Sequence, residues 1–399
     1  MSLDTVSTSD VGNEKSDSSA TMGILSGIPS SSLRERNFLV GNVTTSNSKI
    51  SDDLDNCFPE RKVQIFVGTW NMQRCEVPLS IDDFLLPRAE RFVRDVYVIG
   101  VQEATTDIKG WEIKLQETLG PNHVLIHSMS HGVLHMAIFI RRDLIWFCTD
   151  FQEDKITTRL ISQVKTKGAI AISFQLFGTR FLFISSHFHS GETKVRERIE
   201  DYYKIMGQLH FLSKNSNSTT YQKCDKDFSG FDCVFWFGDL NFRINQPHHF
   251  MQQEVEDPST YNIWEALKCD QLKRNMERGN VFHGFQETEI TFLPTYKFTP
   301  GSDKYDVSVK LRVPSYTDRI LHKPCRSTSI TCHHYNSVSS VKHSDHRPVY
   351  GLFDVSLKPG RNSAPLGKIS FNHEVYMAAA KRRANCVSVV PNSSVCTIL

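Results

Sequence analysis

An α/β fold is predicted for this chain of 399 residues. Five short apolar runs, rich in β-branched and aromatic residues, have the length and composition of buried strands. They cover residues 63–70, 95–101, 180–186, 232–238 and 348–355. Between such runs, residues 194–212 and 260–278 repeat apolar side chains at a spacing close to 3.6, as an amphipathic helix does. Strands that alternate with helices indicate an α/β domain.

The composition is that of a globular protein with little net charge. Hydrophobic residues make up 39%, charged residues 23%, and the formal net charge is +2. The chain therefore lacks the large excess of Lys and Arg that is typical of proteins that bind duplex nucleic acid, although a local basic patch could still bind phosphate. The ten cysteines form no CxxC pair or ligand-spaced cluster, so reduced cytosolic thiols are expected. Without an apolar signal core or a bilayer-length apolar stretch, we expect a soluble protein.

Composition divides the chain into three segments. In residues 1–58 about a third of the side chains are Ser or Thr and aromatics are nearly absent, which predicts disorder. Residues 59–358 are expected to form the catalytic domain. Residues 359–399 begin at Pro359-Gly360 and are expected to be a polar, partly basic tail.

Several predicted strands end in side chains that can take part in hydrolysis. A single strand-end Asn is more often a turn former, and a single Glu is usually solvated. Their coincidence in one chain is the informative observation, because strand ends on a rigid scaffold commonly build a site. The residues are Asn71, Glu103, His187, Asp239 with Asn241, and Asp345 with His346.

Part of this set fits a site for a hard divalent cation. Mg²⁺ takes oxygen ligands and keeps much of its water shell, so few carboxylates suffice. Glu103 is the natural ligand and Asn71 assists it. Asp345 completes the predicted ligand set.

The rest of the set fits hydrolysis of a phosphate ester. Asp239 can orient or deprotonate a water, and Asn241 can donate to the same reaction centre. His187 and His346 can stabilise negative charge on the phosphoryl oxygens. Asp318 is a candidate partner that holds His346 protonated and oriented.

Two segments resemble the signatures of the inositol polyphosphate 5-phosphatases. They are Gly238-Asp239-Leu240-Asn241-Phe242-Arg243-Ile244 and Pro314-Ser315-Tyr316-Thr317-Asp318-Arg319-Ile320-Leu321. The two together are specific, and the resemblance spans about residues 62–357. Shorter matches, shared with the wider endonuclease/exonuclease/phosphatase superfamily, occur at residues 69–71, 102–103, 186–188 and 344–348.

One departure from the second signature points to a subgroup. The family usually has Trp-Cys where this chain has Tyr316-Thr317, and the change leaves Asp318-Arg319 in place. Together with the last four residues, it points to the type IV subgroup. The resemblance implies a four-layer α/β sandwich and Mg²⁺ dependence. It also implies removal of the 5-phosphate from membrane phosphoinositides such as phosphatidylinositol 3,4,5-trisphosphate and phosphatidylinositol 4,5-bisphosphate.

Basic residues before the second signature are candidates for substrate recognition. Taken alone they indicate a solvated basic loop. In the family, the positions matching Tyr296, Lys297, Lys310 and Arg312 are expected to hold the 4-phosphate, since Arg and Lys grip phosphate well. Arg243, in the first signature, is predicted to bind substrate as well.

The segment 187–198 allows two interpretations. Lys194, Arg196 and Arg198 could meet the 1-phosphate or an anionic membrane. The alternative is an ordinary exposed helix start with Glu/Arg pairs three and four residues apart.

The last four residues, Cys396-Thr397-Ile398-Leu399, fit a prenylation motif, and the final Leu favours geranylgeranylation. Lys381-Arg382-Arg383 supplies upstream positive charge, so the chain carries the two signals that stable anchoring needs. The type IV resemblance implies the cytosolic face of Golgi and primary-cilium membranes, with a prenyl-binding carrier protein as partner. We expect a monomer that does not bind nucleic acid.

Two other function classes stay open. A nucleic-acid phosphodiesterase resembling abasic-site endonucleases would share Glu103, Asp239, Asn241 and His346. The other class is a catalytically silent, membrane-anchored interaction module. Such a module has no need of a metal ligand, a base and an imidazole in the same chain.

Overall fold

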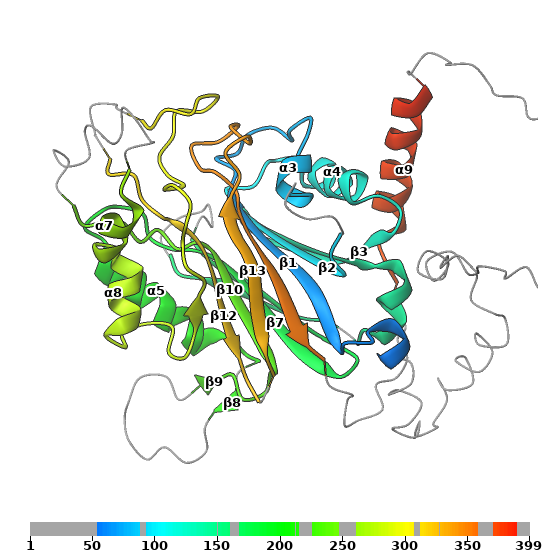
Figure 1. Ribbon diagram of the computed structural model, residues 1–399, viewed down its shortest axis with the longest axis horizontal. Helices are drawn as coiled ribbons and strands as arrows, with labels where there is room; N and C mark the ends of the chain where they lie inside the picture. Colours follow the sequence, from blue (N-terminus) through cyan, green and yellow to red (C-terminus); the bar gives the residue numbers. More distant parts are fainter. Residues whose placement is uncertain are drawn as a thin grey trace, which may run out of the picture. The chain divides into compact units, whose positions relative to one another are not determined.

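The computed structural model describes residues 54–87, 93–149, 151–159, 167–211, 213–214, 226–246, 261–306, 312–326, 328–357 and 370–388. Two six-stranded sheets dominate this part of the chain (Figure 1). The strand order in the first sheet is β13-β14-β1-β2-β4-β3, and in the second it is β11-β12-β10-β7-β6-β5.

The strands of the first sheet come from two parts of the chain, residues 62–141 and 330–356. They are β1 (Lys62–Asn71), β2 (Val96–Gln102), β3 (His123–His131), β4 (Leu134–Arg141), β13 (Ile330–Ser337) and β14 (Val349–Ser356). The second sheet contains β5 (Gln152–Thr157), β6 (Gly168–Leu176), β7 (Thr179–His187), β10 (Cys233–Asp239), β11 (Gln286–Glu287) and β12 (Asp318–Pro324). A separate short pair joins β8 (Ser213–Lys214) to β9 (Lys226–Asp227).

Helices pack against both sheets. They are α3 (Asp82–Leu85), α4 (Ile108–Leu119), the 3₁₀ helix η2 (Arg142–Phe147), α5 (Val195–Gln208), α7 (Ile263–Lys268), α8 (Gln271–Glu277) and α9 (His373–Ser388). One apolar cluster fills the space between the sheets, a second joins the first sheet to α3, α4 and α9, and a third joins the second sheet to α5 and α8. Three apolar interfaces make four layers, so the predicted α/β sandwich is confirmed. None of the described helices is both long and apolar enough to cross a bilayer.

All five predicted strands are present, as β1, β2, β7, β10 and β14. The helix predicted over 194–212 is α5, whereas the helix predicted over 260–278 is two helices, α7 and α8. They are separate because the Asp270 carboxylate caps α8 by accepting from the backbone N–H of Lys273. The remaining strands escaped prediction because several, such as β5, mix charged and apolar residues.

The register brings the predicted strand ends to one edge of the sandwich. β1 and β2 run parallel in one sheet, and β7 and β10 run parallel in the other. Asp239 pairs with His187 across one ladder and with Asp318 across the next. The carboxyl ends of β7 and β10 therefore meet the start of β12 at the same place.

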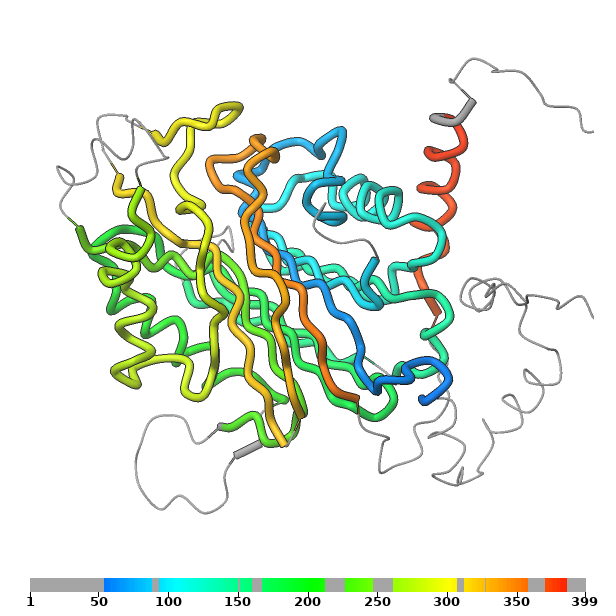
Figure 2. Tube along the Cα trace, viewed as in Figure 1, coloured from blue at the N-terminus to red at the C-terminus, as the bar shows by residue number. Residues whose placement is uncertain are grey.

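The folded part of the chain extends beyond both predicted boundaries of the catalytic domain. Leu54 and Phe58 are buried in the core between the sheets, although they lie in the segment predicted to be disordered. Helix α9 lies in the predicted tail but packs along α4, as Figure 2 traces. The reason is a narrow apolar face: Val375 and Ala379 are buried, and Arg383 Nη1 donates to the Glu117 carbonyl at 3.0 Å. Residues 1–53 lie outside the described residues.

Candidate active site

Asp239 is placed by the last residues of β10. Gly238 has φ 137°, and a Cβ on it would lie 2.0 Å from the backbone oxygen of Ser186. The glycine therefore lets β10 approach β7 closely just before the carboxylate. Asn241 then adopts a left-handed φ of 57°, which turns the chain away from the sheet.

The Asp239 carboxylate is buried, with groups from both sheets around it. Asn71 Nδ2, at the end of β1, donates to Oδ2 at 3.0 Å, and the Asn241 N–H donates to Oδ1 at 3.1 Å. His187 Nε2 lies 3.1 Å from Oδ2. Burial alone raises the pKa of Asp239, but contact with His187 and the charges of His346 and Lys167 hold it well below its usual range. A carboxylate of this kind orients a water by accepting its proton in a hydrogen bond, and it is a weak base.

Lys167 is a site residue that the sequence interpretation missed. It is buried, and its Nζ contacts His187 Nε2. Burial lowers the pKa of Lys167 to about 8, against the opposing charges of Asp239 and Glu103. Burial and Lys167 together lower the pKa of His187. The only signal in the sequence is a Lys directly before the apolar run 168–174, at the start of a strand, whereas the predicted site residues follow the carboxyl ends of strands.

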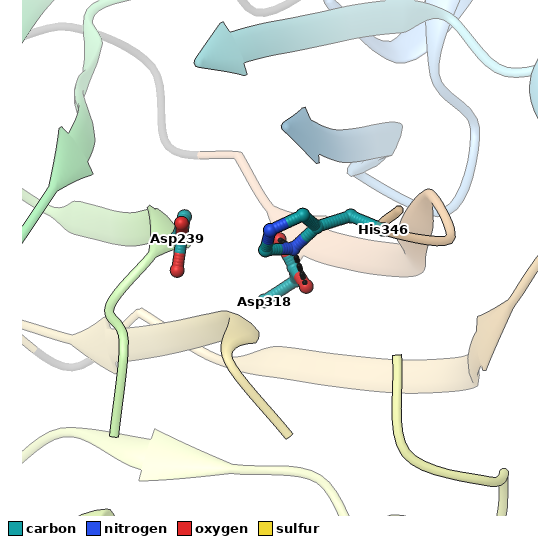
Figure 3. A group of neighbouring side chains, drawn as sticks. All are labelled: Asp239, Asp318 and His346. Carbon is teal, nitrogen blue, oxygen red and sulfur yellow. Dashed lines mark hydrogen bonds and ion pairs between the residues drawn. The ribbon is translucent and has the colours of Figure 1, made fainter. Parts of the chain in front are cut away.

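His346 and Asp318 form the predicted pair. His346 Nδ1 lies 2.9 Å from Asp318 Oδ2, and Figure 3 shows the ring beside Asp318 with its other nitrogen toward Asp239. Burial disfavours a charged imidazole, but the Asp318 carboxylate outweighs burial and raises the pKa of His346 to about 9. The side chain is therefore an imidazolium at neutral pH. A positive group faces the space in front of Asp239.

Neighbours of Asp318 fix its orientation. Thr295 and Thr317 donate their hydroxyls to Oδ2 at 2.7 and 2.8 Å. Thr317, one of the two residues that depart from the family's signature, thus contacts the pair directly. Arg319 points to the opposite face of the strand and forms buried ion pairs with Asp270 at 3.0 Å and Glu287 at 2.5 Å. The alternation in β12 explains why an acid and a base stand side by side in the signature.

The donor set beside this pair suits a hard cation. Glu103 follows β2 with a left-handed φ of 45° and is half-buried. Burial raises the pKa of Asp345, and the negative charges of Glu103 and Asp239 act in the same direction. The carboxylates of Glu103, Asp239 and Asp345, with the Asn71 amide alongside, form the oxygen-rich set that Mg²⁺ or Ca²⁺ prefers. The residues fit the predicted metal.

A second group of residues has the spacing of a metal site but not its chemistry. Asp239, Asp318 and His346 each offer a ligand atom within 4.8 Å of the others. The Asp318 carboxylate already accepts the hydrogen bond of the protonated His346 ring, and an imidazolium repels cations. We therefore assign this grouping to proton holding and the Glu103 side to the metal.

Asn241 and Arg243 act on each other. Asn241 Nδ2 donates to the Phe188 carbonyl at 3.1 Å, and Arg243 Nη2 donates to Asn241 Oδ1. Arg243 is buried, with its guanidinium 4.4 Å from the centroid of the Tyr296 ring. In this structure Arg243 holds Asn241 and supports Tyr296 instead of reaching solvent.

The residues predicted to grip a second phosphate lie next to His346. The Tyr296 ring centroid is 4.4 Å from that of His346, and Arg312 Nη1 donates to the Tyr296 hydroxyl at 2.6 Å. Lys297 Nζ lies 2.5 Å from Asp306 Oδ2, with about a quarter of its side chain exposed. Lys310 and Cys396 lie outside the described residues.

The basic residues of 194–198 follow the second interpretation. Lys194 pairs with Glu197 at 2.6 Å and Arg196 with Glu200 at 3.1 Å. Arg198 is buried, and it donates to the Gly191 carbonyl at 2.7 Å and to Gln271 Oε1 at 2.6 Å. Arg198 is therefore a structural residue that fixes the loop after β7, and its buried position does not support the first interpretation, contact with a phosphate or membrane.

Comparison with known proteins identifies the family of this chain. Residues 68–352 match the family model described as Endonuclease/Exonuclease/phosphatase family 2. The chain is 44% identical over 389 residues to the Rattus norvegicus phosphatidylinositol polyphosphate 5-phosphatase type IV, covering 95% of this chain and 60% of the relative. The predicted resemblance to inositol polyphosphate 5-phosphatases is thereby confirmed. The chain spans about 60% of the length of such relatives.

Two solved structures share the fold. The inositol polyphosphate 5-phosphatase domain of SPsynaptojanin, in complex with inositol (1,4)-bisphosphate and calcium ion, is 28% identical with a TM-score of 0.63, covering 86% of this chain and 98% of that one. A Cimex nitrophorin ferrous NO complex is 25% identical with a TM-score of 0.57, covering 75% of this chain and 100% of that one. Since the family model spans most of the chain, the chain belongs to the endonuclease/exonuclease/phosphatase family.

Proposed function

We propose that this protein is a metal-dependent phosphatase that removes the 5-phosphate from membrane phosphoinositides, including phosphatidylinositol 3,4,5-trisphosphate and phosphatidylinositol 4,5-bisphosphate. The observation that carries the proposal is the position of Tyr296, which packs against His346 on one side and binds Arg312 through its hydroxyl. A site for hydrolysis and a cationic grip thus share one residue. Such an arrangement suits a ring that carries two neighbouring phosphates.

The residues of the chain divide the chemistry between them. Asp239 orients the attacking water by accepting its proton in a hydrogen bond, and Asn241 completes that side of the site. The imidazolium of His346 neutralises charge that develops on the phosphoryl oxygens, with Asp318 keeping it protonated. Lys167 adds positive charge behind Asp239, and His187 lies within hydrogen-bond distance of its carboxylate.

We propose Mg²⁺ as the metal, held by Glu103, Asp345 and the Asn71 amide. When bound, the ion would act as a Lewis acid on the phosphoryl group. The calcium ion in the related synaptojanin complex supports a divalent, oxygen-seeking cation as the metal. The carboxylates that face one another around Asp345 give the same indication from this chain alone.

We propose that the protein works at the cytosolic face of Golgi and primary-cilium membranes as a monomer. Prenylation at Cys396, delivery by a prenyl-binding carrier protein and the exposed residues Lys381, Arg382 and Arg383 would together supply the anchor. Helix α9 supports this proposal because it carries those basic residues on a helix docked against α4. The anchor would then be attached to the folded domain at a fixed place.

The test is phosphate release from a panel of lipid and soluble inositol phosphates, in Mg²⁺ and in EDTA. We expect release from substrates with a 5-phosphate, its loss in EDTA, and at least about a hundredfold lower kcat in Asp239→Ala. Asp143→Ala, an exposed carboxylate paired with Arg141, is the matched control. Unchanged release in Asp239→Ala, or nicking of abasic duplex DNA in place of lipid hydrolysis, would contradict the proposal.

A further inference from the structure

The loop 297–306 closes on itself through the residue predicted to grip phosphate. The Asp306 N–H donates to the Lys297 carbonyl at 2.8 Å, and the Lys297 ammonium donates to Asp306 Oδ2 at 2.5 Å. Inside this pair, the rings of Phe298 and Tyr305 stack with centroids 4.4 Å apart. Backbone, side-chain and ring contacts therefore hold the two ends of the loop together.

The closed loop is fixed to the catalytic segment. The Phe298 N–H donates to the Asp345 carbonyl at 2.9 Å, and the Gly301 N–H donates to the Lys342 carbonyl at 2.7 Å. Arg347 donates to the Ser302 carbonyl. Lys297 directly precedes Phe298, so its ammonium lies beside the site. Its positive charge acts to lower the pKa of Asp345, against the larger effect of burial.

We propose that Asp306 is a specificity-determining residue, whose carboxylate competes with the substrate phosphate next to the scissile one for the ammonium of Lys297. The inference deepens the proposed function and rests on it. Lys297 and Asp306 are only about a quarter and a sixth exposed, so little water screens the pair. A ring phosphate carries more negative charge than a carboxylate and displaces it. A ring hydroxyl at the same position is neutral and leaves the ion pair intact.

Asp306 therefore limits how much affinity the neighbouring phosphate contributes. A substrate with that phosphate must break the Lys297–Asp306 pair and then lies close to a carboxylate. A substrate without it does neither. Asp306→Asn keeps an oxygen acceptor for the Lys297 ammonium, and the backbone N–H of residue 306 still donates to the Lys297 carbonyl. The substitution therefore removes the charge with little change of shape.

Binding can be measured with ligands that lack a 5-phosphate and are not consumed. Isothermal titration calorimetry gives Kd for soluble inositol 1,4-bisphosphate and for inositol 1-phosphate. In Asp306→Asn the preference for the bisphosphate rises about fivefold, the size expected for a partly exposed ion pair. In Lys297→Met the preference falls, and Asp306→Asn added to Lys297→Met changes nothing further.

Asp303→Asn is the matched control, because it removes the same charge from the same loop. Asp303 pairs with Lys342 at 2.5 Å and is two-thirds exposed. A preference that falls in Asp306→Asn would show that the carboxylate positions Lys297 and would overturn the inference. An equal rise in Asp303→Asn, or equal Kd values for the two ligands in the unaltered protein, would overturn it as well.

A kinetic arm separates this inference from the proposed function. Short-chain phosphatidylinositol 4,5-bisphosphate and phosphatidylinositol 5-phosphate differ only in the 4-phosphate. Asp306→Asn lowers the KM of the first relative to the second, and the effect lies in KM, not in kcat. A protein that shows the predicted Kd shifts but releases no phosphate would contradict the proposed function and leave the role of Asp306 standing.

Discussion

Replacing Asp318 by Asn tests whether a protonated His346 is needed for the reaction. The substitution keeps the size of the side chain and an acceptor for the Thr295 hydroxyl, but it removes the charge that holds the proton. Burial then acts on His346 against the charges of Asp239 and Asp345 only, and it favours the neutral imidazole. We expect the alkaline limb of the kcat profile to move to lower pH.

The size of the effect follows from the pKa values. At a pKa of about 9, His346 is almost fully protonated at pH 7.5. An ordinary pKa of 6.5 leaves about a tenth of the imidazole protonated at that pH, and burial lowers the fraction further. kcat at pH 7.5 therefore falls at least about tenfold in Asp318→Asn, and the loss is smaller at pH 6.

The free energy of unfolding depends on the protonation of His346 as well. The folded pKa of His346 lies above the unfolded one, so its stabilising contribution is complete below pH 6.5 and is lost as the pH rises through about 9. The contribution is about 2 kcal/mol at pH 7.5 and about 3 kcal/mol at lower pH. Asp318→Asn removes it, which urea unfolding at pH 6 and pH 9.5 measures.

The assay is kcat on a short-chain phosphoinositide between pH 6 and pH 9.5, at saturating Mg²⁺. Asp354→Asn is the control: it makes the same change in a carboxylate that lies 2.9 Å from the exposed His333, in the outer strands β13 and β14. An alkaline limb at the same pH in Asp318→Asn and the unaltered protein would refute the assignment. So would an equal loss of kcat at pH 6 and pH 8.5.

Two further predictions concern stability and the tail. Burial lowers the pKa of His322 to about 4, so the unfolded state binds the proton first and stability falls as the pH drops from 6.5 toward 4. His322→Gln should remove about 2 kcal/mol of the loss between pH 7 and pH 5, as chemical unfolding at both pH values measures. Ala379→Asp places a carboxylate in the α4–α9 interface and should loosen α9 by about 2–4 kcal/mol. Hydrogen exchange of the α9 amides reports this, with the exposed Ala380→Asp as control.

The sequence predicted the strands that carry the site because their apolar runs end abruptly in polar residues. Asn71, His187 and Asp239 follow uninterrupted buried strands, and β-strands delivered them to one edge as expected. The pairing of His346 with Asp318 was also predictable as chemistry, because an imidazole that must stay charged needs a carboxylate. The register of β12 against β10 places Asp318 beside Asp239, and only the folded structure shows that His346 lies 2.9 Å from Asp318.

Other parts of the site depend on tertiary contacts that no local pattern shows. Arg198 reads as a surface cation on an amphipathic helix, yet it is buried because loop carbonyls and Gln271 use its donors. Lys167 reads as a loop residue, yet the pairing of β6 with β7 brings its neighbour Gly168 opposite His187. The docking of α9 was missed because two buried residues, Val375 and Ala379, give only a weak apolar period.

The site exists only where the two sheets come together. Asn71 belongs to the first sheet and Asp239 to the second, and the hydrogen bond between them crosses the core. Gly100 makes this approach possible, because a Cβ there would lie 2.6 Å from the Phe237 ring and from Ser185 Oγ. A nitrophorin in a ferrous NO complex shares the sandwich, which agrees with the general rule that a fold does not by itself determine a function. The proposed hydrolysis therefore depends on the polar residues at this edge, and their mutual geometry depends on how closely the apolar core lets the sheets pack.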